Sequence, residues 1–130
     1  MKRYVEEPGS ETVRALLAEA TPTSARFSEV EIASALARRC REGAFPAAER
    51  DRAMTQLRED FRTLSLVETT GGVVGKAVSL LGRHPLRAAD ALQLASCLEL
   101  RERLDLPVRF IAFDERLLAA ARSEGLATAL

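Results

Sequence analysis

The sequence predicts an α/β domain in which helices cover a mainly parallel central sheet, giving three layers. Helical and strand-like segments alternate along the chain, as they do in this class. A compact apolar run at 108–113 has the length and composition of a buried parallel strand. A chain of 130 residues is long enough to bury a single core. We therefore expect one domain, residues 1–130, and exclude a multidomain protein.

Three helices are predicted in the first half, over about 10–20, 29–41 and 46–64. Ser10 is a suitable cap for the first helix, Gly43 ends the second, and Pro46 suits the first position of the third. No strand is predicted before the first helix. The inner stripe of the second helix is predicted to be Val30, Ala33, Leu36 and Ala37.

The second half starts with a weak strand signal at 64–70 and continues with helices over about 72–84, 85–100 and 115–123. The apolar positions of the first of these helices are Val74, Ala77, Val78 and Leu81. The run 108–113 supplies the buried strand. Gly125 stops the last helix, and 126–130 forms a short final strand.

Composition limits the functions that the chain can have. The formal net charge is zero, so any contact with nucleic acid must come from a local patch. No run approaches the roughly 20 apolar residues of a membrane span, and the first residues lack a signal-peptide core. We expect a cytoplasmic protein without a membrane partner. Cys40 and Cys97 have no Cys or His at metal-ligand spacing, so we expect buried free thiols.

The predicted helix at 85–100 is apolar on nearly every face, yet Asp90 lies near its start. Taking a lone carboxylate out of water costs on the order of several kcal/mol. A cation or hydrogen-bond donors must offset this cost. One interpretation is structural: Arg87 or the first-turn N–H groups satisfy Asp90. The other is that Asp90 belongs to a metal site.

Two further acids share this ambiguity. Asp114 directly follows the predicted strand, where ligands bind in parallel sheets, but it also precedes a helix that it could cap. Glu31 forms a capping-box pattern with Ser28. A parallel sheet could bring Glu31, Asp90 and Asp114 to one edge, where their mutual repulsion implies a bound cation. Oxygen ligands suit Mg²⁺ or Mn²⁺, which activate water for phosphodiester hydrolysis.

The segments 28–38, 85–96 and 110–121 resemble the PIN-domain family, specifically the VapC-type toxin ribonucleases of VapBC toxin/antitoxin modules. The resemblance covers essentially the whole chain. It implies a three-layer PIN-like fold and a Mg²⁺- or Mn²⁺-dependent endoribonuclease that acts on RNA. It also implies a cognate antitoxin that inserts into the active-site groove, and a homodimer. By position, the metal-binding acids would be Glu31, Asp90 and Asp114, and the weaker candidates for holding phosphate are Arg87 and Arg26.

The chain departs from the family at its start. The family opens with a hydrophobic strand ending in D-x-S, whose Asp binds metal, whereas here Lys2 follows Met1 at once. Two explanations stay open: a start at an internal methionine, which the intact flanking motifs favour, or a degenerate relative that binds metal poorly. On either explanation the domain is truncated relative to the family. The alternative functions are a catalytically silent partner-binding module and a structural domain with three unrelated capping acids.

Overall fold

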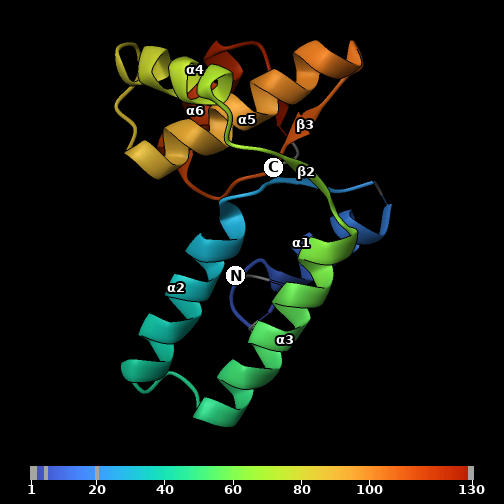
Figure 1. The fold of residues 1–130 in the computed structure, drawn as a ribbon, viewed down its shortest axis with the longest axis vertical. Helices are drawn as coiled ribbons and strands as arrows, with labels where there is room; N and C mark the ends of the chain where they lie inside the picture. Colours follow the sequence, from blue (N-terminus) through green and yellow to red (C-terminus); the bar gives the residue numbers. More distant parts are fainter. Residues whose placement is uncertain (1–2, 5, 20, 129–130) are drawn as a thin grey trace. The chain divides into compact units, whose positions relative to one another are not determined.

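The computed structural model describes residues 3–4, 6–19 and 21–128, and the chain forms two compact units, Met1–Leu66 and Val67–Leu130. Within the described residues there are six helices and four short strands (Figure 1). Their mixture along the chain is that of an α/β protein. None of the described helices combines the length and the apolar composition that a membrane crossing requires.

Helices dominate the first unit, as predicted; they are α1 Ser10–Glu19, α2 Ser28–Arg41 and α3 Ala47–Thr63. The strands β1 Thr23–Ala25 and β2 Ser65–Val67 pair with each other in a two-stranded sheet. Helix α2 packs against α3, and Leu36 and Ala53 are buried between them. Gly43 follows the end of α2, as predicted. Its φ is +82°, and its N–H donates to the Cys40 carbonyl oxygen at 3.1 Å.

One prediction for the first unit is wrong, and one strand was missed. Val30 is 71% exposed and does not belong to the inner stripe of α2. The buried face is set by Leu36 and by Ile32, which packs against the core one turn earlier, and Val30 lies about 200° around the helix from Ile32. Strand β1 was not predicted, because three residues are too few to show an alternating pattern.

The second unit contains α4 Gly71–Leu81, α5 Ala88–Leu104 and α6 Glu115–Ser123, with strands β3 Arg109–Phe110 and β4 Ala127–Thr128. Strands β3 and β4 are parallel, in the register that places Arg109 opposite Ala127. The predicted stop after α6 is confirmed at Gly125, which has a φ of +84° and donates its N–H to the Arg122 carbonyl oxygen at 3.0 Å.

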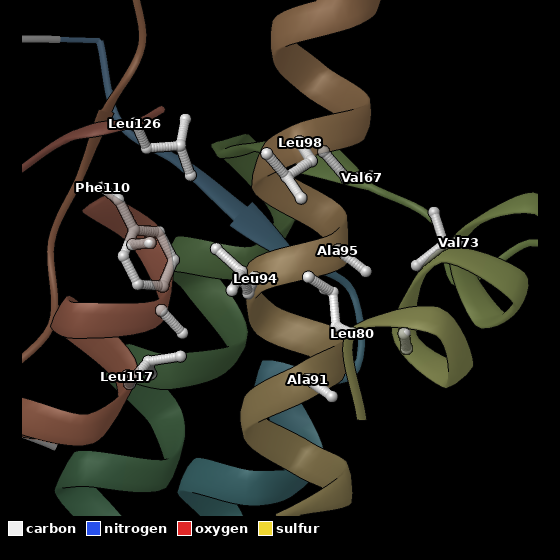
Figure 2. Packing of buried hydrophobic residues seen from close by; sticks show 13 residues of the cluster. Val67, Val73, Leu80, Ala91, Leu94, Ala95, Leu98, Phe110, Leu117 and Leu126 are labelled. Carbon is white, nitrogen blue, oxygen red and sulfur yellow. The ribbon is translucent and has the colours of Figure 1, made fainter. Parts of the chain in front are cut away.

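Helix α5 is the centre of this unit. Figure 2 shows Val73 and Leu80 of α4 on one side of α5, and Phe110 of β3 and Leu117 of α6 on the other. Leu94 of α5 is completely buried in this cluster. The packing confirms that the helix carrying Asp90 is a central one, at least within its own unit.

Element boundaries in the second unit differ from the prediction. The buried strand expected over 108–113 is reduced to two residues, because β4 offers only two partners; Ile111 and Phe113 are exposed. Helix α5 begins at Ala88 and not at Pro85, since Arg87 still has extended backbone, with ψ of 162°. Helix α4 buries one apolar face and exposes another. The buried residues are Val73, Ala77 and Leu80, and the exposed ones are Val74, Val78 and Leu81.

The strands described here therefore form two sheets of two strands each. The arrangement in three layers around one central sheet, and the organisation of the chain as one domain, stay predictions.

Candidate functional site

Asp90 is the third residue of α5, in the first turn of the helix. Its side chain is half-buried, less enclosed than the sequence predicted, and it makes no hydrogen bond or ion pair with any residue that the structure describes. Arg87, the N-cap residue of α5, is exposed, makes no side-chain cap hydrogen bond and does not pair with Asp90. The interpretation of Asp90 as the partner of Arg87 is therefore wrong.

The hydrophobic core fixes the position of the helix turn that carries Asp90. Ala91, the next residue, is completely buried, and Leu94 and Ala95 follow one turn later with no exposed surface (Figure 2). These contacts hold the first turn of α5 against β3 and α6 on one side and α4 on the other. The Asp90 carboxylate is thus carried on a rigid part of the unit although its own oxygens have no described partner.

Asp114 is the N-cap residue of α6. Its Oδ1 accepts a hydrogen bond from the backbone N–H of Leu117 at 3.0 Å, so the capping interpretation is confirmed. The side chain is exposed. An ionised carboxylate has about four acceptor positions, and one N–H occupies only one of them. A cap and a cation ligand are therefore compatible roles for Asp114.

Asp114 is also close to the end of a strand, although not directly after it as predicted. Strand β3 ends at Phe110, and the segment 111–113 separates it from the acid. The difference follows from the short β4, which leaves this segment without a strand partner in the described sheet.

Glu31 is the fourth residue of α2 and is half-buried. The N-cap residue of α2 is Phe27, which makes no side-chain cap hydrogen bond, and not Ser28 as the predicted capping box requires. Ser28 instead lies inside the helix and is buried.

The three acids are divided between the two units: Glu31 belongs to the first, and Asp90 and Asp114 belong to the second. Among the described residues, no group of three or more His, Cys, Asp or Glu side chains is arranged to hold a metal ion. The convergence of these three acids on one cation stays a prediction. So do the phosphate-holding roles of Arg87 and Arg26; Arg26 is an exposed residue of the turn between β1 and α2.

The acids whose pKa values are shifted belong to ion-pair networks that the sequence did not reveal. In the first unit, burial raises the pKa of Asp60, but hydrogen bonds from Arg3, Tyr4 and Gln56 outweigh it and leave the pKa below its ordinary value. Tyr4 donates to Asp60 at 2.7 Å, and burial together with this bond raises its own pKa. This network ties the segment before α1 to α3.

A second network joins the residues that follow α4 to the residue that follows α6. Glu124 accepts hydrogen bonds from Arg83 at 3.0 Å and pairs with His84 at 2.7 Å, and these contacts lower its pKa. A hollow in this unit is lined by residues of this network and its neighbours, and neither Asp90 nor Asp114 is among them. We therefore assign the network to stability and not to a site.

Both cysteines are free thiols, as predicted, and both are half-buried. Burial raises the pKa of Cys97 to about 11, so this thiol stays protonated at neutral pH.

A comparison with curated proteins gave no match. The family model of the PIN domain matches residues 4–123, which is nearly the whole chain and includes Glu31, Asp90 and Asp114. Proteins of this family are generally nucleases, so membership supports a nuclease. The chain belongs to the PIN domain family.

Proposed function

We propose that the chain is a Mg²⁺- or Mn²⁺-dependent endoribonuclease and the toxin component of a type II toxin/antitoxin module. The observation that carries this proposal is Asp90, a half-buried carboxylate without a described partner at the start of the central helix of its unit, in a chain of the PIN family. A half-buried carboxylate whose oxygens meet no described residue keeps its acceptor positions available to a cation.

The donor set fits a hard divalent cation in its chemistry. Asp90 offers carboxylate oxygens that no described residue engages, and Asp114 keeps acceptor capacity beyond its bond to Leu117. Mg²⁺ is commonly held by one or two carboxylates together with water. Glu31 is proposed as the third acid.

In this proposal Asp90, Asp114 and Glu31 hold the cation. When bound, the metal ion supplies an activated water and stabilises the charge that develops on the scissile phosphate. The chain's own contribution is positioning. The core beneath Ala91 and Leu94 fixes Asp90, and the N–H of Leu117 orients the Asp114 carboxylate. Arg87 and, more weakly, Arg26 are proposed to orient the phosphate of the RNA.

The proposed partners are RNA, a cognate antitoxin and a second copy of the chain, in the cytoplasm. A second candidate function, a catalytically silent partner-binding module, is favoured by one observation: α4 exposes an apolar face. Val74, Val78 and Leu81 are 44%, 63% and 42% exposed. Residues at this spacing form one stripe along a helix, and such a stripe is a surface for a partner.

Cleavage of single-stranded RNA separates the two candidates. The unaltered chain is incubated with RNA in Mg²⁺, in Mn²⁺ and in EDTA, beside Asp90→Asn. The matched control is Asp105→Asn, which makes the same change at the other end of α5. Asp105 is exposed and has a φ of 50°, which Asn tolerates.

If the chain is a nuclease, RNA is cleaved only in the presence of the metal ion, and Asp105→Asn retains this cleavage. We expect Asp90→Asn to lower it by more than about 100-fold, because even groups that merely orient metal ligands contribute 10- to 100-fold. Binding of Mn²⁺, measured by calorimetry, should fall in parallel. The silent module predicts no cleavage by any form. Cleavage that persists in EDTA would show that the metal site is assigned wrongly. So would cleavage by Asp90→Asn at the level of the unaltered chain.

A further inference from the structure

The arginines of the second unit divide into two groups. Four are engaged by hydrogen bonds or ion pairs: Arg83 and Arg101 with Glu124, Arg103 with Glu99, and Arg122 with Thr128. Three are exposed, and their side chains make no such contact with any residue in the described part of the chain; these are Arg87, Arg109 and Arg116.

Two of the unengaged arginines stand where a cation is unfavourable. Arg87 is the N-cap residue of α5, and Arg116 is the second residue of α6. The start of a helix carries partial positive charge, so cations are disfavoured there, and Arg is not among the preferred N-cap residues. The engaged Arg101 and Arg103 occupy the last turn of α5, where cations are favoured. The two arginines at the helix starts therefore serve neither the helix nor an internal ion pair.

Both are close in the sequence to residues that lie toward one end of the hydrophobic cluster. Figure 2 places Ala91 and Leu117 toward one end of the hydrophobic cluster, and Leu98 and Leu126 toward the other. Arg87 precedes Ala91 by one turn, and Arg116 is adjacent to Leu117. This is the end at which α5 carries Asp90 and α6 carries Asp114. Two cations that pair with no described residue thus accompany the two candidate metal-binding acids.

We propose that Arg87 and Arg116 act together as a phosphate clamp, contacting the RNA backbone on either side of the position that Asp90 and Asp114 define. This inference rests on the proposed function. The two carboxylates repel a polyanion, and the arginines offset that repulsion where the backbone must approach. Guanidinium groups suit this role, since they bind phosphate oxygens in bidentate fashion. The pair adds Arg116 to the proposed site and gives Arg87 a partner residue.

The test measures RNA binding apart from cleavage. A short fluorescein-labelled oligouridylate is titrated with the unaltered chain, Arg87→Gln and Arg116→Gln in EDTA, and the fluorescence anisotropy is followed over a series of salt concentrations. Arg103→Gln is the matched control: it removes an exposed arginine from the opposite end of α5.

We expect each clamp variant to bind about tenfold more weakly, the loss typical of one hydrogen bond to a charged group. The slope of log affinity against log salt should fall by about 0.7 for each lost phosphate contact to a single strand. Arg103→Gln should bind as the unaltered chain does. The melting temperatures of Arg87→Gln and Arg116→Gln should equal or exceed that of the unaltered chain, because a misplaced cation has been removed from a helix start.

Unchanged affinity of both clamp variants overturns the inference, and so does an equal loss in Arg103→Gln or an unaltered chain that does not bind the oligouridylate. The outcomes also separate the inference from the proposed function. RNA binding that depends on both arginines, without metal-dependent cleavage, keeps the clamp and removes the nuclease. Metal-dependent cleavage together with normal RNA binding by the arginine variants keeps the nuclease and removes the clamp.

Discussion

The observed role of Asp114 as a helix cap and its proposed role as a metal ligand can be separated by two substitutions at this position. Its Oδ1 accepts from the Leu117 N–H at 3.0 Å, and the side chain is exposed. Asparagine is as good an N-cap as aspartate but lacks the anionic oxygens that Mg²⁺ prefers. Asp114→Asn therefore removes the ligand and keeps the cap. Asp114→Ala removes both.

The expected magnitudes follow from the geometry of the cap. Loss of the cap in Asp114→Ala should lower the free energy of unfolding by about 1 kcal/mol. The exposed charge at the helix start adds a few tenths of a kcal/mol, roughly the lower end of the usual range, and Asp114→Asn loses only this part. For a chain of 130 residues, 1 kcal/mol corresponds to about 3–5 °C in the melting temperature.

The assay combines urea unfolding, followed by circular dichroism, with Mg²⁺-dependent RNA cleavage. We expect Asp114→Asn to unfold close to the unaltered chain yet to lose cleavage as completely as Asp114→Ala does. If Asp114→Asn retains cleavage, Asp114 is a cap and nothing more. If it unfolds as early as Asp114→Ala, the reasoning from the cap is refuted instead.

The remaining predictions concern the two units separately. Leu94→Ala should destabilise the second unit by about 2–5 kcal/mol because Leu94 is completely buried, whereas Val78→Ala, at a site 63% exposed, should stay within about 0.5 kcal/mol; equal urea midpoints would contradict this. The folded-state pKa of Asp60 is lowered, so its stabilisation is present above the unfolded pKa of about 3.9 and is lost as pH falls through the folded value. Urea midpoints of Asp60→Asn should therefore fall less than those of the unaltered chain between neutral and acid pH, and parallel declines would argue against the Asp60 network. Cys97, whose pKa is raised to about 11 by burial, should react slowly with a disulfide reagent at neutral pH and rapidly in urea; immediate reaction in the folded chain, compared with Cys97→Ser, would disprove its protection.

Helices were more predictable from the sequence than strands. The bounds of α1, α2 and α6 lie within one residue of their predicted positions, because each is amphipathic and is framed by local signals such as Ser10 and Gly125. The strand at 108–113 was predicted three times too long, since its apolar run does not say how many partners a neighbouring strand offers. Helix α4 is apolar on two faces, so periodicity alone does not identify the buried one.

The candidate site was predictable in its elements and not in its contacts. The sequence correctly placed Glu31, Asp90 and Asp114 near the starts of helices. It could not decide which of them cap. Ser28 and Glu31 fit the capping-box pattern although the N-cap residue of α2 is Phe27, whereas Asp114 does cap its helix. Local spacing is shared by caps and by sites, and only the position of the first helical N–H groups separates them.

The two acids of the second unit differ in how a bound cation would affect their side chains. The Asp114 carboxylate is already oriented by an internal N–H, so little side-chain freedom remains to be lost on binding. The Asp90 carboxylate has no such bond to a described residue, although the helix turn that carries it is packed on Ala91 and Leu94. A metal ion would therefore order Asp90 more than Asp114.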